Sequence, residues 1–205
     1  VIKVLNLLPL ASEDVRRTEL TDPVPWFSEL NQALFLLPFA VLPYAIRTLY
    51  YNYVSHELPG RCAMWGCLFV YTMTFGVYWI HFLRHLSKKY GYFHGARGRD
   101  TIPFSEVNKI AKEILGAVLL RSALVVYSSY DPHAAPSLSI WTPLQLFFFT
   151  VVDDFYYYWL HRVCHETESA WKLHRLHHTT KAPTLLLLGY ADDIHECFDL
   201  FLVPL

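Results

Sequence analysis

The chain has 205 residues, of which 54% are hydrophobic and 17% aromatic, and its formal net charge is only −1. This composition is too apolar for an ordinary soluble domain, and it lacks the basic excess that nucleic-acid-binding domains usually carry. The four cysteines form no paired CxxC array: Cys62, Cys67, Cys164 and Cys197. A disulfide framework and a cysteine-rich zinc site are therefore not indicated, and we expect reduced thiols.

One apolar run is a strong candidate for a membrane span, and three others are weaker candidates. The run 33–46 contains Pro38 and Pro43, which a span tolerates when neighbouring groups satisfy the freed carbonyls. The run 62–80 has no charged residue and nearly matches the roughly 20 residues that a spanning helix needs. The run 62–80 is therefore the clearest predicted span, whereas the run 33–46 is shorter.

Two further apolar runs are each too short for a full span alone. The run 114–127 is interrupted by Arg121, and the run 138–152 ends at two aspartates. The linker 128–137 joins the two as the turn of a helical hairpin would. Buried helices of a large soluble core are the alternative for all four runs. We predict an all-α integral membrane bundle of about four transmembrane helices.

Charge placement predicts the orientation of this bundle. The segment 84–99 is rich in Lys and Arg, whereas the linker 128–137 has neither. By the positive-inside rule the first lies in the cytosol and the second across the membrane. The chain would then return to the cytosol after residue 152. We divide the chain into an N-terminal cytosolic segment, residues 1–32, a transmembrane helical region, residues 33–152, and the start of an incomplete C-terminal domain, residues 153–205.

The stretch 161–178, HRVCHETESAWKLHRLHH, holds five of the eleven histidines. His161 and His165 are four residues apart, so on a helix they share one face. His174, His177 and His178 form a second such face. Two imidazoles placed in this way can hold one metal ion, and both patterns recur directly after an expected membrane span. We therefore predict that the stretch binds metal.

A helix break is expected between the two histidine patterns. His165 and His174 are nine positions apart, which puts them on opposite sides of one straight helix. They can share a site only if the chain bends between them. Thr167 or Ser169 could cap the new helix.

Imidazole ligands suit Zn, Cu, Fe and Ni, so ligand type alone leaves the metal open. The stretch contains neither HExxH nor its inverse, so the zinc-protease arrangement is missing. Five histidines exceed one tetrahedral site, which favours a two-metal centre, and a redox pair such as iron could activate dioxygen. The similar spacing of His81 and His85 is interpreted as the polar end of a membrane helix.

The runs DDFYYYWLHRVCHE and WKLHRLHHTTKAPT resemble the fatty acid hydroxylase and sterol desaturase superfamily, and YADDIHECFD resembles its fungal sterol C-4 methyl oxidase or C-5 desaturase-like members. The resemblance implies a non-haem di-iron centre at the endoplasmic reticulum membrane. It also implies dioxygen as oxidant and electrons from NAD(P)H through cytochrome b5. The substrate would be a sterol or fatty acyl lipid, which is hydroxylated or desaturated.

By position, the resemblance assigns five metal ligands: His161, His165, His174, His177 and His178. Family members carry a third HxxHH cluster further along, which is absent up to Leu205. We therefore expect a truncated sequence that binds metal substoichiometrically, with His195 as an extra ligand. Asp154, on the same helical face as His161, is expected to accept an imidazole N–H. Alternatives are a histidine-rich metal carrier and an inactive metal-binding or scaffold protein.

Overall fold

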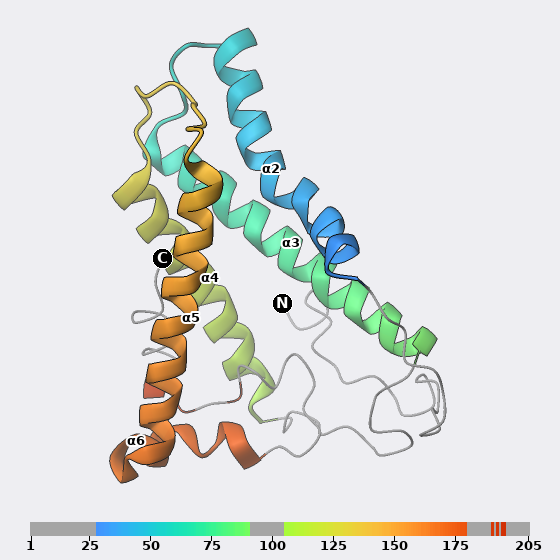
Figure 1. Ribbon diagram of the computed structural model, residues 1–205, viewed down its shortest axis with the longest axis vertical. Coiled ribbons are helices and arrows are strands. Elements are labelled where there is room, and N and C mark those ends of the chain that lie inside the picture. Colours follow the sequence, from blue (N-terminus) through green and yellow to red (C-terminus); the bar gives the residue numbers. More distant parts are fainter. Residues whose placement is uncertain (1–27, 91–104, 180–189, 191, 193, 196–205) are drawn as a thin grey trace.

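The computed structural model describes residues 28–90, 105–179, 190, 192, 194 and 195, and its regular elements are all helical (Figure 1). They are α2 Glu29–Tyr53, α3 Arg61–Tyr90, α4 Val107–Ser129, α5 Thr142–Glu166, α6 Glu168–His174 and the 3-10 helix η2 His177–Thr179. The all-helical prediction is confirmed for these residues. Most of the predicted N-terminal segment and of the basic segment 84–99 lies outside them.

Helix α2 shows how the first apolar run becomes one long helix. The Ser28 side chain accepts a hydrogen bond from the backbone N–H of Asn31 and so caps its first turn. Pro38 and Pro43 lie inside the helix without ending it. The run of apolar residues therefore extends to 25 helical residues.

Two described helices, Glu29–Tyr53 and Arg61–Leu86 within α3, are long and apolar enough to cross a membrane. The most apolar stretch of each is not buried inside the molecule, unlike the core helix of a soluble protein. Together with the many exposed large apolar side chains of the described chain, this indicates a membrane protein. The expected total of about four spans stays a prediction.

The helices pack through two small cores. Val107, Ile110 and Ala111 of α4 form the first, against α3 and Tyr190. Leu58, Val126 and Tyr130 form the second, at the other end of α4. Helix α2 contacts α3 through aromatic rings, including Phe35 and Phe82, whose centroids are 4.7 Å apart.

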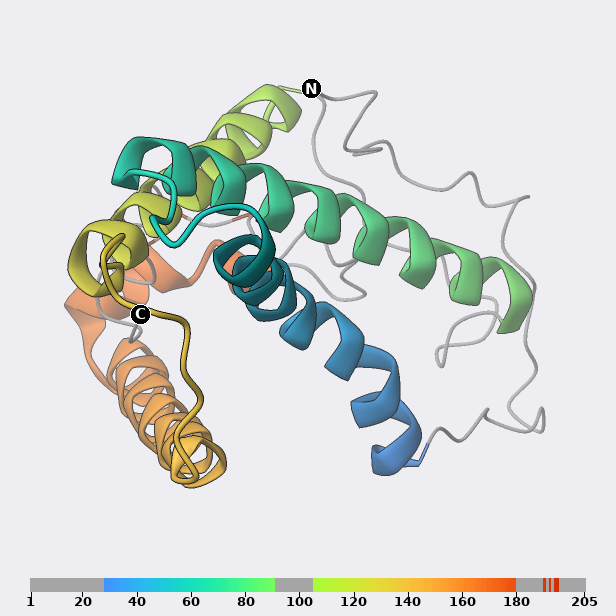
Figure 2. The same ribbon diagram turned by 90° about the horizontal axis from the view of Figure 1, so that it is seen from above.

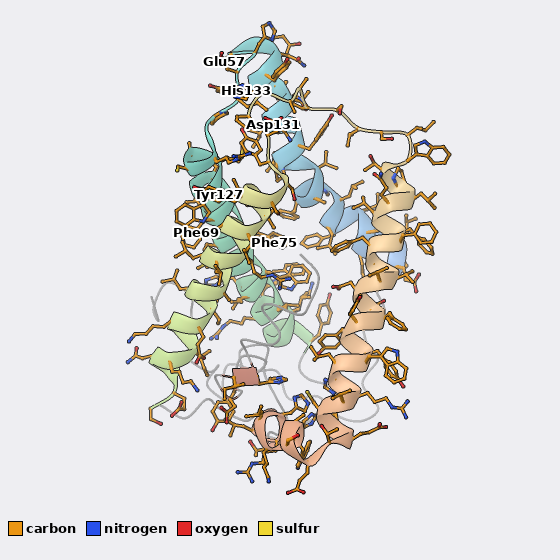
Figure 3. The ribbon with its side chains drawn as sticks, turned by 90° about the vertical axis from the view of Figure 1, so that its left-hand side faces the viewer. Glu57, Phe69, Phe75, Tyr127, Asp131 and His133 are labelled. Carbon is orange, nitrogen blue, oxygen red and sulfur yellow. The ribbon has the colours of Figure 1, made fainter. Side chains whose placement is uncertain are left out.

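Helix α5 stands apart from the other long helices. It is antiparallel to α4, as predicted for a hairpin, but Figures 2 and 3 show that the two diverge instead of packing along their length. Cys164 is its one buried residue. Glu57, Asp131 and His133 mark one end of the molecule, and α6 lies at the opposite end (Figure 3). Helix α5 thus carries its histidines to the end where α4 begins.

The α4 core gives a test of the packing. Ile110 is 1% exposed, so Ile110→Ala should lower the free energy of unfolding by about 2–5 kcal/mol. Leu120→Ala on the same helix, where the side chain is 37% exposed, should cost less than about 1 kcal/mol. Denaturant titration of both variants in detergent measures the difference. Equal losses would contradict the assignment of this core.

Candidate metal centre

Four histidine side chains converge where α5, α6 and η2 meet. Their ring nitrogens are suited to hold one metal ion, since one ligand atom from each lies within 4.8 Å of those of the others. We call His161, His165, His174 and His178 the four-histidine group. Helix α5 supplies the first two, α6 the third and η2 the fourth. The two predicted histidine patterns therefore come together in space.

The chain bends at Thr167, as the histidine spacing required. Thr167 has extended backbone angles, φ −112° and ψ 131°, between α5 and α6. Its hydroxyl donates a hydrogen bond back to the Val163 carbonyl at 2.8 Å and does not cap the new helix. The break is thus at a residue predicted for it, although the side chain closes the old helix. Short α6 then turns His174 toward α5.

Ring nitrogens within the group are close enough to share a small cation. His161 and His165 place their Nε2 atoms 3.0 Å apart. His174 and His178 place theirs 2.7 Å apart. The two pairs face each other, because the His161 and His174 ring centroids are 4.7 Å apart and those of His165 and His178 are 4.5 Å apart. Donor atoms of this type and spacing fit a transition metal such as iron.

His174 is the central member of the group and is 1% exposed. Burial, and then the neighbouring His195, His161, His178 and His165 rings, lower the pKa of His174 to about 3. The ring therefore stays neutral through the physiological range. Only a neutral imidazole has a lone pair to offer a metal, so this environment keeps His174 competent as a ligand.

Aromatic and charged side chains surround the group. The Trp171 ring lies 5.3 Å from that of His165 and 5.7 Å from that of His178, which it stacks against. The Tyr157 ring lies 5.8 Å from that of His161. Arg162 is held by Glu166, with Nε 2.7 Å from the carboxylate. Sequence reasoning assigned no role to Trp171, although its place between the two histidine patterns was a usable signal.

A second group adjoins the first. Cys164, His174 and His195 are all buried, and one ligand atom from each lies within 4.8 Å of those of the others. Sequence reasoning named His195 as an extra ligand but did not connect it with Cys164. Cys164 lies one residue before His165, so its position in the HRVCH motif was the available signal.

Other sequence candidates lie elsewhere. Asp154 is exposed and makes no hydrogen bond with any described histidine, so its role as an acceptor stays a prediction. His81 and His85 are exposed on α3 and belong to neither group among the described residues. His177 lies in η2, but its side chain is outside the described part of the structure. Its assignment therefore rests on the motif.

Comparison with known proteins finds two matches, a family and a curated relative. Residues 146–204 match the fatty acid hydroxylase family. The chain is also 30% identical, over 199 residues, to the fatty acid hydroxylase vlmA of Lecanicillium sp. That alignment covers 89% of this chain and 54% of the relative, so the chain spans about half the length of the curated relative it matches. No solved structure matches the chain significantly.

The two matches support the resemblance to the fatty acid hydroxylase and sterol desaturase superfamily that the histidine motifs predicted. The matched region begins in α5 and includes both described histidine groups.

Proposed function

We propose that the chain forms part of a membrane-bound, non-haem di-iron oxygenase that oxidises a lipid with dioxygen. The observation that carries the proposal is the convergence of the four-histidine group at the end of an exposed apolar helix. A metal carrier would be expected to place its ligands at mid-membrane depth, whereas these follow the apolar part of α5. The arrangement therefore favours an enzyme acting at the membrane surface.

The proposed iron ligands are the four-histidine group together with His177. Iron bound there would supply dioxygen activation and the oxidation of an unactivated C–H bond. The protein's own part is to hold neutral imidazoles in register: the helical spacing aligns His161 with His165, and the bend at Thr167 brings His174 to them. NAD(P)H, through cytochrome b5, is the proposed electron source.

The exposed aromatic residues of α5 support a place at the membrane interface. Five consecutive side chains, residues 155–159, are exposed just before His161. Four of these five are tyrosine or tryptophan, which are typical of the interfacial belt of membrane proteins. The guanidinium of Arg162 follows, over the Trp159 ring at 5.6 Å. A lipid in the adjoining leaflet could thus approach the histidines without leaving the bilayer.

The substrate is proposed to be a fatty acyl lipid that is hydroxylated, because the matched relative is named a fatty acid hydroxylase. A sterol substrate, or desaturation, is the second outcome to be tested. Cells that express the complete gene, grown under ¹⁸O₂, should accumulate a fatty acyl product carrying one ¹⁸O atom. The His178→Ala variant should lose that product, and His85→Ala should retain it. If the product is instead an unlabelled sterol with a new double bond, the fatty acyl substrate and the hydroxylation are both wrong.

The proposed location is the endoplasmic reticulum membrane, with several spans and the histidines on the cytosolic side. An introduced cysteine beside His178 should react with an impermeant maleimide in sealed microsomes. A cysteine introduced within 128–137 should react only after the membrane is opened, because the positive-inside rule places that linker in the lumen. Equal labelling of both sites in sealed microsomes would overturn the topology.

A further inference from the structure

His174 presents its two ring nitrogens to two different sets of side chains. Its Nε2 atom lies 2.7 Å from Nε2 of His178, within the four-histidine group. Its Nδ1 atom, on the other side of the ring, lies 3.1 Å from Nε2 of His195. One imidazole therefore borders two ligand sets.

The second set also contains a thiol. Cys164 is 8% exposed and lies on α5, and His195 is likewise 8% exposed. Tyr190, five residues before His195, packs against the core formed by Val107, Ile110 and Ala111. The thiol and the two imidazoles are thus held from three separate parts of the chain. This is a built arrangement rather than an accident of one helix.

The geometry points to a second metal site, formed by Cys164, His174 and His195, which shares His174 with the four-histidine group. We propose that it takes a borderline divalent ion, Zn²⁺ in the first place, through the Cys164 thiolate, Nδ1 of His174 and Nε2 of His195. A thiolate and two imidazoles are ligands that Zn²⁺ prefers. A fourth position would remain for water or another ligand.

The distances agree with this assignment. Zn–N bonds of about 2.0–2.1 Å in a tetrahedral site put two nitrogens about 3.3 Å apart. The observed separation between His174 and His195 is 3.1 Å. Binding releases the thiol proton of Cys164 to solvent. The proton shared between Nδ1 of His174 and Nε2 of His195 moves to the other nitrogen of its own ring, so that both imidazoles stay neutral. If both sites were loaded, His174 would offer one ring nitrogen to each, which would require its remaining ring proton to pass to solvent.

The proposal makes Cys164 a metal ligand beyond the five histidines that the family resemblance assigns. A simpler role for His195 is to orient His174 by a hydrogen bond, with no metal between them. The two roles differ in one observable property. Only the metal site puts sulfur in contact with a bound ion.

Cobalt(II) is the probe, because a cobalt–thiolate bond has a near-ultraviolet charge-transfer band that cobalt–imidazole bonds lack. Titrating the purified metal-free 205-residue chain with Co²⁺ should produce this band. The band should persist in Cys67→Ser, an exposed cysteine on α3, and vanish in Cys164→Ser. His195→Ala should raise the Kd for this band at least about tenfold. No band in the wild-type chain, or a band that survives in Cys164→Ser, would overturn the proposal.

Zinc X-ray absorption on the wild-type chain tests the site without a variant, so its result does not depend on how a variant folds. Zinc K-edge X-ray absorption should show one sulfur neighbour at about 2.3 Å with imidazole nitrogens. A zinc shell without sulfur would refute the site, and so would loss of the sulfur in Cys197→Ser but not in Cys164→Ser. Iron binding by the four-histidine group should persist in Cys164→Ser, so failure here is distinguishable from failure of the proposed function.

Discussion

The His174→Ala variant is expected to lose bound iron, with iron per protein falling by about tenfold or more relative to the wild-type chain. His174 is the most buried member of the four-histidine group, and its ring lies within 5 Å, centroid to centroid, of those of His161, His165 and His178. Removing it deletes a ligand and separates the α5 pair from His178. Iron content by plasma mass spectrometry of the purified chain measures the effect.

His85→Ala is the matched control, because it removes an exposed histidine of α3 that belongs to neither histidine group. Its iron content should equal that of the wild type. Circular dichroism of both variants should show the same helix content, so that loss of metal is not loss of fold. Equal iron in His174→Ala and wild type would mean that the wrong site has been chosen.

The Trp171→Ala variant should bind iron about tenfold more weakly while keeping its helices. The indole contacts the rings of His165, His174 and His178, and each aromatic contact contributes about 0.5–1.5 kcal/mol. Without it the imidazoles lose the surface that fixes their orientation. Competition with a chromogenic chelator measures the Kd for iron.

Trp171→Phe is the control for this effect, since phenylalanine keeps a ring at the same position. It should recover most of the affinity. If alanine and phenylalanine at this position bind iron as tightly as the wild type, the indole does not orient the ligands. The four-histidine group would then be held by the helices alone.

The parts of the site that depend on local spacing were predictable from the sequence. The four-residue spacing of His161 and His165 predicts one helical face, and their Nε2 atoms are 3.0 Å apart. The nine-residue separation of His165 and His174 required a bend, which occurs at Thr167. Helical geometry fixes such relations, so no tertiary information was needed.

Helix boundaries were predicted less well, because hydropathy records only the apolar part of a helix. The third apolar run was taken to begin at residue 114, whereas α4 begins at Val107. Its polar first turns are supported by the Lys109–Glu113 ion pair at 3.6 Å and by burial of Ile110. Helix α5 likewise continues past its apolar run to Glu166.

Contacts between distant residues left no periodic signal. His195 is 21 residues from His174, and the 3.1 Å between their ring nitrogens arises from tertiary structure. By sequence alone, Cys164 resembles an ordinary apolar position of a helix. The structure shows that it lies near His195. The divergence of α4 and α5 was likewise not predictable, because a short linker does not determine whether two helices pack along their length.

The most direct test of the account is iron K-edge X-ray absorption on the purified chain after loading with iron(II). The account predicts iron retained through gel filtration, with a first shell of nitrogen and the outer-shell scattering of several imidazole rings. Iron lost on filtration, or iron bound by oxygen ligands without imidazole scattering, would contradict the convergence of the histidines on one metal centre.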